Sequence, residues 1–136
     1  MPFAVCLIAA GLAQPSRIAS VLERCGIPVW TPSSAGADEG GIYRNAICLV
    51  IDMPGDAGVR TLRLLRQYGI KTPALLIADS GYAPGPAELG DAWVLNVIPR
   101  TADPREVLRW IECMCVTRGL LDRLHAAEED CGALVA

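Results

Sequence analysis

The sequence predicts one α/β domain in which a parallel sheet lies between two layers of helices. Short apolar runs of strand length alternate with segments of helical spacing along the 136 residues. Apolar residues make up 52% of the chain but aromatic residues only 5%, which predicts an aliphatic core of the kind that buried parallel strands require. Because crossovers between parallel strands are right-handed, this alternation indicates a doubly wound three-layer sandwich.

Five strands are expected, each from an apolar run. The first run is continuous, as in a strand that is buried on both faces. Pro or Gly residues lie beside most of the runs and mark their ends. The five runs cover residues 3–10, 27–31, 46–51, 73–78 and 93–98.

Two helices are well specified between these strands. The first opens at Gln14-Pro15-Ser16, continues to about Cys25 and is stopped by Gly26. The second covers residues 58–68, before Gly69, and is the clearest helix of the chain. Its expected inner face consists of Val59, Leu62, Leu65 and Tyr68.

The fourth helix of the pattern is degenerate. Residues 80–89 contain Pro84, Gly85 and Pro86, which are incompatible with a normal helix. Residues 32–43 are glycine-rich and specify at most a short helix.

A long helix is expected at the C-terminus, starting at Asp103-Pro104 and reaching about Glu129. It is longer than one side of a small sheet needs, so we divide the chain into a domain over 1–120 and a helical extension or tail over 121–136. The extension either pairs with another chain or frays, and both remain open. Near coiled-coil spacing is seen for Val107, Trp110, Met114, Leu121 and Leu124, with Thr117 as an interruption.

Composition excludes several classes of partner. The formal charge of −3 gives no basic surface for nucleic acid or an anionic membrane. No segment is long enough to span a bilayer, and the apolar start lacks the basic residues of a signal peptide. Six cysteines without zinc-ligand spacing are expected to be reduced and mostly buried. The sequence therefore predicts a soluble cytoplasmic protein.

Residues 45–79, NAICLVIDMPGDAGVRTLRLLRQYGIKTPALLIAD, give a strand–loop–helix–strand unit, and IPRTADPREVL follows the fifth strand. Gly58 and Pro73 are separated by fifteen residues. This pattern resembles the receiver domain of two-component response regulators over roughly residues 3–117. The resemblance implies a flavodoxin-like fold with sheet order 2-1-3-4-5. It also implies an aspartate after strand three that accepts a phosphoryl group from a histidine kinase, assisted by two Mg²⁺-binding acids, a Thr or Ser, and a Lys.

Most of these chemical groups are missing. The acid-pair positions correspond to Ala9 and Ala10, and the hydroxyl position to Ala78. The lysine position corresponds to Arg100, or to Ile98 if the register moves by two. One or two isolated carboxylates bind a divalent ion weakly, so Mg²⁺ binding is expected to be weak or absent.

Two residues compete for the phosphoacceptor position. Spacing from Pro54 and Gly58 places Val50 there, whereas Asp52 requires a loop two residues shorter. We favour Val50, which would remove the acceptor altogether.

Two roles are open for each of the other groups of charged residues. Asp52, Asp56 and Asp79 either form a replacement cation site or cap turns and helix starts, and capping is favoured. The row Arg60, Arg63 and Arg66 either docks an acidic partner or forms a solvated helix face, and the solvated face is favoured.

No catalytic set is visible. His125 is the only histidine and is expected at the surface, without a Ser or Cys partner. We therefore expect no enzyme activity. The candidate interface residues are Trp93, Trp110, Met114 and Leu121.

These observations lead to the hypothesis of a pseudo-receiver. Such a signalling module would bind a protein partner, either a histidine kinase or another signalling protein, or a second copy of itself, without phosphorylation. One alternative is an atypical response regulator phosphorylated on Asp52. Another is a sensor of a small ligand such as a cyclic dinucleotide, held by Arg60, Arg100 and an aromatic residue, Trp93 or Tyr82.

Overall fold

A single five-stranded parallel sheet forms the centre of the computed structural model, which describes residues 4–9, 17–31, 41–79, 81–82 and 84–135, with the backbone alone for 91 and 120–135. The sheet order is β2-β1-β3-β4-β5, as predicted. All four strand pairings are parallel. The strands are β1 (Val5–Ala9), β2 (Val29–Trp30), β3 (Cys48–Asp52), β4 (Ala74–Ala78) and β5 (Val94–Pro99).

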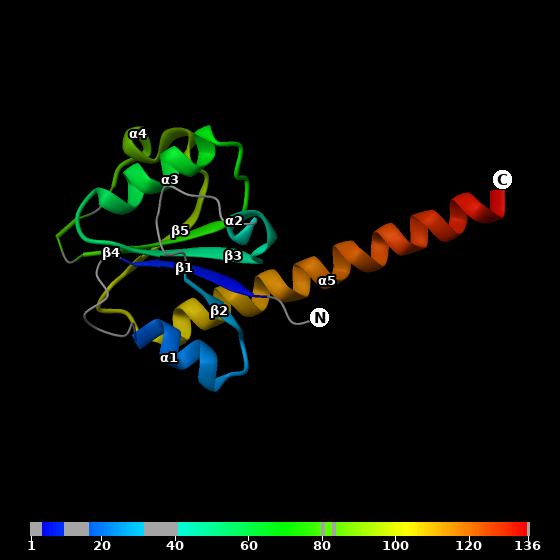
Figure 1. Ribbon diagram of the computed structural model, residues 1–136, viewed down its shortest axis with the longest axis horizontal. Helices are drawn as coiled ribbons and strands as arrows, with labels where there is room; N and C mark the ends of the chain where they lie inside the picture. Colours follow the sequence, from blue (N-terminus) through cyan, green and yellow to red (C-terminus); the bar gives the residue numbers. More distant parts are fainter. Residues whose placement is uncertain (1–3, 10–16, 32–40, 80, 83, 136) are drawn as a thin grey trace.

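Helices cover both faces of this sheet, which confirms the three-layer sandwich (Figure 1). Helices α2, α3 and α4 lie on one side, and α1 and α5 lie on the other (Figure 1). The helices are α1 (Arg17–Arg24), α2 (Ile42–Asn45), α3 (Ala57–Gln67), α4 (Pro86–Leu89) and α5 (Pro104–Val135), with a 3-10 turn η1 (Gly90–Ala92) after α4.

Strand residues alternate between two apolar layers because successive side chains of a strand point to opposite faces. In β3, Leu49 and Ile51 pack with α3, whereas Val50 packs with α1 and α5. Residues at the centre of both layers are fully buried, and their side chains are almost all aliphatic. The predicted aliphatic core is therefore confirmed.

Helix α3 lies unusually close to the sheet at Gly58. A Cβ atom at this position would lie 2.7 Å from Cδ1 of Leu76 and 3.2 Å from Cγ2 of Ile51. Val59, Leu62 and Leu65 form its buried face as predicted. Tyr68 was wrongly assigned to that face: it follows the helix and is 62% exposed.

The connection between β4 and β5 contains only the four-residue helix α4 and the η1 turn. Pro86 occupies the first turn of α4, which is the one helical place where proline is well tolerated. The prediction of a degenerate fourth helix is confirmed.

Helix α5 has 32 residues, and its C-terminal half extends beyond the sheet (Figure 1). Its first half packs on the domain through Val107 and Ile111, which are buried, and through Met114 and Cys115, which are half-buried. The helix continues past the predicted end at about Glu129 to Val135. The proposed division of the chain at 120 stays a prediction, and it falls within this continuous helix.

The cysteines are less buried than expected. Cys6 and Cys48 lie in the core, where burial raises the pKa of each thiol to about 12. Cys25 and Cys113 are exposed, contrary to the prediction of mostly buried thiols, and every cysteine whose side chain is described is free. In the described part of the chain, no helix is both long and apolar enough to cross a membrane.

Candidate functional site

Three charged side chains meet where adjacent strands end. Asp52 is the last residue of β3, Asp79 directly follows β4, and Arg100 directly follows β5. The backbone N–H of Arg100 donates to the carbonyl of Ala78 at 2.8 Å, which extends the pairing of β4 and β5 by one step. Because β3, β4 and β5 are neighbours and parallel, their carboxyl ends bring these groups together.

The Arg100 guanidinium bridges the two acids. Its Nε donates to Oδ1 of Asp79 at 2.7 Å, and its Nη1 donates to Oδ1 of Asp52. Its Nη2 donates to the carbonyl of Met53 at 3.3 Å. The second oxygen of Asp79 accepts from the backbone N–H of Gly55 at 2.8 Å. We call Asp52, Asp79 and Arg100 the carboxyl-edge triad.

Hydrogen bonding shifts the pKa values of Asp79 and Arg100. The Gly55 N–H and then the Arg100 guanidinium hold the pKa of Asp79 below its ordinary value. Burial acts to lower the pKa of Arg100, but hydrogen bonds to Asp79 and Asp52 outweigh it, so its pKa is raised. Both groups are therefore charged at neutral pH, and the guanidinium is held by a negative charge on each side.

Val50 and Asp52, the two candidates for the phosphoacceptor position, lie in different surroundings, and the choice between them stays a prediction. Val50 is fully buried in the layer formed with α1 and α5. Asp52 ends the strand, with its side chain 15% exposed. The loop from Met53 to Asp56 is short because Gly55 adopts a left-handed backbone with φ +54°, which glycine adopts without strain.

The positions that match the acid pair and the hydroxyl residue of receiver domains are alanines, so they carry no metal ligand or hydroxyl group. Ala9 ends β1, pairs with Asp52 and is exposed, while Ala10 lies outside the described residues. Ala78 ends β4 and is buried, and Arg100, not the buried Ile98, follows β5. In the described ranges, no three His, Cys, Asp or Glu side chains gather as a metal site.

Asp56 does not join the triad. Its carboxylate pairs with Arg60 at 3.2 Å, one turn along α3, and both side chains are mostly exposed. Asp56 occupies the cap position of α3 without a side-chain cap hydrogen bond, so the capping prediction is wrong for it. Asp79 does fix a loop, through Gly55.

The arginine row is solvated only in part: Arg60 and Arg63 are exposed, whereas Arg66 is half-buried. Arg66 donates to the carbonyls of Ile70 at 2.8 Å, Thr72 at 2.7 Å, Ala92 at 2.8 Å and Trp93 at 3.2 Å. Its guanidinium also lies 5.8 Å from the centre of the Trp93 ring, within cation–π range. Burial lowers the pKa of Arg66.

Arg63 holds the same region, because it donates to the carbonyls of Ala87, at 3.1 Å, and Glu88. The expectation of a solvated row is therefore corrected for Arg63 and Arg66, which bind the connection between β4 and β5 to α3. The helical period placed these arginines on the outer face correctly. The helical period does not predict that the connection between β4 and β5 crosses that face.

The candidate interface residues differ in exposure. Trp93 precedes β5, has a left-handed φ of +54° and is 60% exposed. Trp110 is 36% exposed on α5, whereas Met114 is half-buried against the domain. Leu121 and His125 lie where only the backbone is described.

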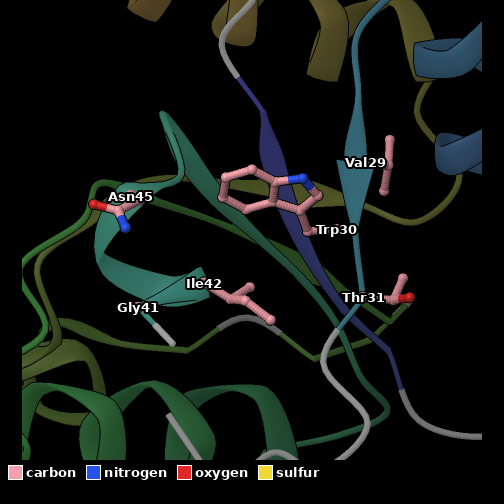
Figure 2. Close-up of a pocket in the computed structure, with 6 residues that line it drawn as sticks. All are labelled: Val29, Trp30, Thr31, Gly41, Ile42 and Asn45. Carbon is pink, nitrogen blue, oxygen red and sulfur yellow. The ribbon is translucent and has the colours of Figure 1, made fainter. Parts of the chain in front are cut away.

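A hollow of about 530 Å³ lies beside β2 (Figure 2). The Trp30 ring extends across it toward α2, where Ile42 and Asn45 lie. The described residues that line it include no charged side chain. It therefore presents no acid, base or ligand set for chemistry.

Solved structures confirm the fold. FixJ-N shares 22% identity with this chain, with a TM-score of 0.66 over 84% of this chain and 94% of that one. A CheY-like response regulator receiver domain protein from Methanospirillum hungatei shares 17% identity, with a TM-score of 0.62 over 86% and 98%. A response regulator receiver protein from Pseudoalteromonas atlantica shares 16%, with a TM-score of 0.64 over 84% and 98%.

The chain therefore has the receiver-domain fold that the sequence pattern predicted. No family model matches the sequence, and no curated protein does.

Proposed function

We propose that this protein is a pseudo-receiver, a signalling module that acts by protein recognition without accepting a phosphoryl group. One observation carries the proposal: Arg100 is bound to both acids of the carboxyl-edge triad. The guanidinium lies between the two carboxylates, in the place where a phosphoryl-transfer site requires a divalent cation. Unlike a metal ion, a guanidinium cannot coordinate several oxygen ligands around one centre, and three of its five N–H groups already donate to Asp79, Asp52 and Met53.

Charge opposes phosphorylation of Asp52. The triad carries one net negative charge, and an acyl phosphate of about −1.5 to −2 in place of the Asp52 carboxylate would make the total about −1.5 to −2. Phosphoryl transfer depends on cations and fixed donors that offset charge on the equatorial oxygens. Ala9 and Ala78 supply neither, and Asp79 places a further negative charge at the site.

Recognition of a protein partner is the function that remains. The receiver-like fold, the exposed Trp93 and the exposed Trp110 support binding to a histidine kinase, to another signalling protein or to a second copy. The acidic net charge supports a role without nucleic acid or membrane binding. We place this role in the cytoplasm and propose it without enzyme activity.

The test is an NMR titration of the full chain with MgCl₂, followed by beryllofluoride or acetyl phosphate. We expect no saturable shift of the amides around Asp52, because neither the ion nor the phosphoryl analogue finds sufficient ligands. Saturable shifts at Asp52 and Gly55 that disappear in Asp52→Asn would refute the proposal.

A specific observation favours one alternative, phosphorylation of Asp52. Asp52 ends β3, and Arg100 lies beside it as a cation, so an atypical response regulator phosphorylated on Asp52 is the second candidate. A phosphate-affinity gel after incubation with acetyl phosphate separates the two. A shifted band that is lost in Asp52→Asn supports this alternative. The cyclic-dinucleotide hypothesis is weakened because Arg100 is already paired, and calorimetry against such nucleotides tests it.

A further inference from the structure

Helix α5 presents two apolar stripes, and the domain uses only one of them. Val107 and Ile111 are buried against the sheet and α1. The exposed side chains of the same helix lie on another side: Trp110 is 36% exposed, Val116 is 64% exposed, and Cys113 is exposed. At 100° per residue, Trp110 and Cys113 lie about 100° and 160° around the helix from Ile111.

The outer stripe continues along the sequence at heptad spacing. Steps of three and four residues alternate without interruption from Trp110 to the end of the helix, as expected for positions a and d of a coiled coil. We call this set the outer seam. Its members are Trp110, Cys113, Thr117, Leu120, Leu124, Ala127, Cys131 and Leu134.

The outer seam keeps Trp110 and Leu124 of the heptad pattern that the sequence predicts but does not include its other members, Val107, Met114 and Leu121. The structure commits Val107 and Met114 to the domain, so they cannot pair with another chain. Thr117 is then a member of the repeat and not an interruption.

The C-terminal half of α5 needs a partner to be a stable helix. Among the α5 side chains that the structure describes, the last to pack on the core is Cys115, and the following stretch to Val135 is about 30 Å long at 1.5 Å per residue. Isolated helices of this length are marginal in water. Gly119 and Gly132 each weaken it further, by about 1 kcal/mol relative to alanine.

We infer that the outer seam binds the same seam of a second copy, forming a parallel two-stranded coiled coil. A heptad stripe is self-complementary, so a second copy is the occupant that its own pattern specifies. The inference deepens the proposed function, since it selects the second copy among the partners named there, but it does not rest on the loss of phosphorylation, because the seam would pair whether or not Asp52 is phosphorylated.

The charged residues that flank the outer seam favour a parallel orientation of the two helices. With the seam at a and d, Arg123 falls at position g and Glu128 at position e of the next heptad. These are the positions that face each other between parallel chains, so each Arg123 meets a Glu128 of the second copy. The same rule pairs Val116 with Leu121, which accounts for the 64% exposure of Val116 in the single chain.

Two adjacent alanines allow a matched test of the seam. Ala127 lies at d and Ala126 at c, so Ala127→Glu puts two carboxylates into the seam whereas Ala126→Glu leaves them in solvent. Sedimentation equilibrium of the full chain should give twice the 14.5 kDa chain mass. Ala127→Glu should weaken dimerisation more than about tenfold, and Ala126→Glu should leave it unchanged.

Cysteine oxidation tests the orientation. A variant in which Cys25, Cys113 and Cys115 are replaced by Ser retains Cys131 as its one cysteine outside the core strands. Mild oxidation should give a covalent dimer, because identical seam positions face each other only in a parallel pair. The control carries Cys131→Ser and Ala126→Cys in addition, and should give little cross-linking.

Each experimental outcome either supports or overturns a stated part of the inference. A protein that remains monomeric at about 100 μM, or a dimer that Ala127→Glu leaves intact, overturns the inference. A dimer that Ala127→Glu dissociates but that Cys131 does not cross-link is antiparallel or shifted, and it overturns the parallel seam. Circular dichroism of both glutamate variants should show the same folded domain.

Discussion

Arg100 defines the chemistry of this molecule at the scale of single residues. Two carboxylates at neighbouring strand ends would repel each other, and the guanidinium between them offsets that repulsion. A planar guanidinium can do this because it directs several N–H groups to different acceptors at once. A lysine ammonium would not reproduce this bridge.

The pKa of Asp79 is a direct measure of the triad. In Arg100→Gln we expect this pKa to rise toward 3.8 but to remain below it, because the Gly55 N–H still donates to the carboxylate. Carboxyl NMR over a pH titration measures it, and Arg60→Gln is the control that should leave it unchanged. An unchanged Asp79 pKa in Arg100→Gln would contradict the ion pair.

The depressed pKa also fixes the sign of the pH dependence. A folded-state pKa below the unfolded value stabilises the protein above about pH 4, and this stabilisation is lost as the pH falls through the folded value. The wild-type chain should therefore lose more unfolding free energy on acidification than Arg100→Gln does.

Arg66 takes a second single-residue role, as the anchor of the connection before β5. Arg66→Ala leaves four carbonyls without their donor and should lower the free energy of unfolding by about 2 kcal/mol or more. Arg60→Ala, on the same helix, removes only an exposed pair and should cost less than about 0.5 kcal/mol. Urea unfolding compares the two, and equal losses would contradict the anchoring role.

At the scale of elements, the close approach of α3 to the sheet explains why position 58 is glycine. Gly58→Ala would force its methyl against Leu76 and Ile51, which should cost about 1–3 kcal/mol, less about 1 kcal/mol gained in helix propensity. Gly119→Ala on α5 meets no atom within 4 Å and should stabilise by about 0.5–1 kcal/mol. Thermal unfolding of both variants checks the opposite signs.

The strands could be predicted because aliphatic runs mark them, and right-handed crossovers indicated helices on both faces, whereas the strand order came from the resemblance to receiver domains. The choice between Val50 and Asp52 depends on the length of the loop before α3, which the sequence does not fix, and the left-handed Gly55 in that loop is compatible with a tight turn. The arginine row failed for a different reason, since helical period identifies a face but not the segment that covers it. The triad could have been found from Asp79 and Arg100, which directly follow adjacent strands.

At the scale of the whole molecule, the triad and the projecting end of α5 lie at opposite edges of the sheet. The triad lies at the carboxyl ends of the strands, and α5 starts at that edge and runs back past the amino ends (Figure 1). Neither feature contacts the other through the described residues. We therefore expect changes at the carboxyl-edge triad to leave any pairing through the projecting end of α5 unaffected.

The reversed course of α5 has a consequence for how an assembled pair would meet a target. If the C-terminal halves of two α5 helices lie side by side, the two domains would both present their Asp52–Arg100 edges on the side away from the paired helices. A target with two matching epitopes could then engage both domains, and the second contact would form at the high local concentration that tethering provides. Weak individual contacts would suffice for such bivalent capture.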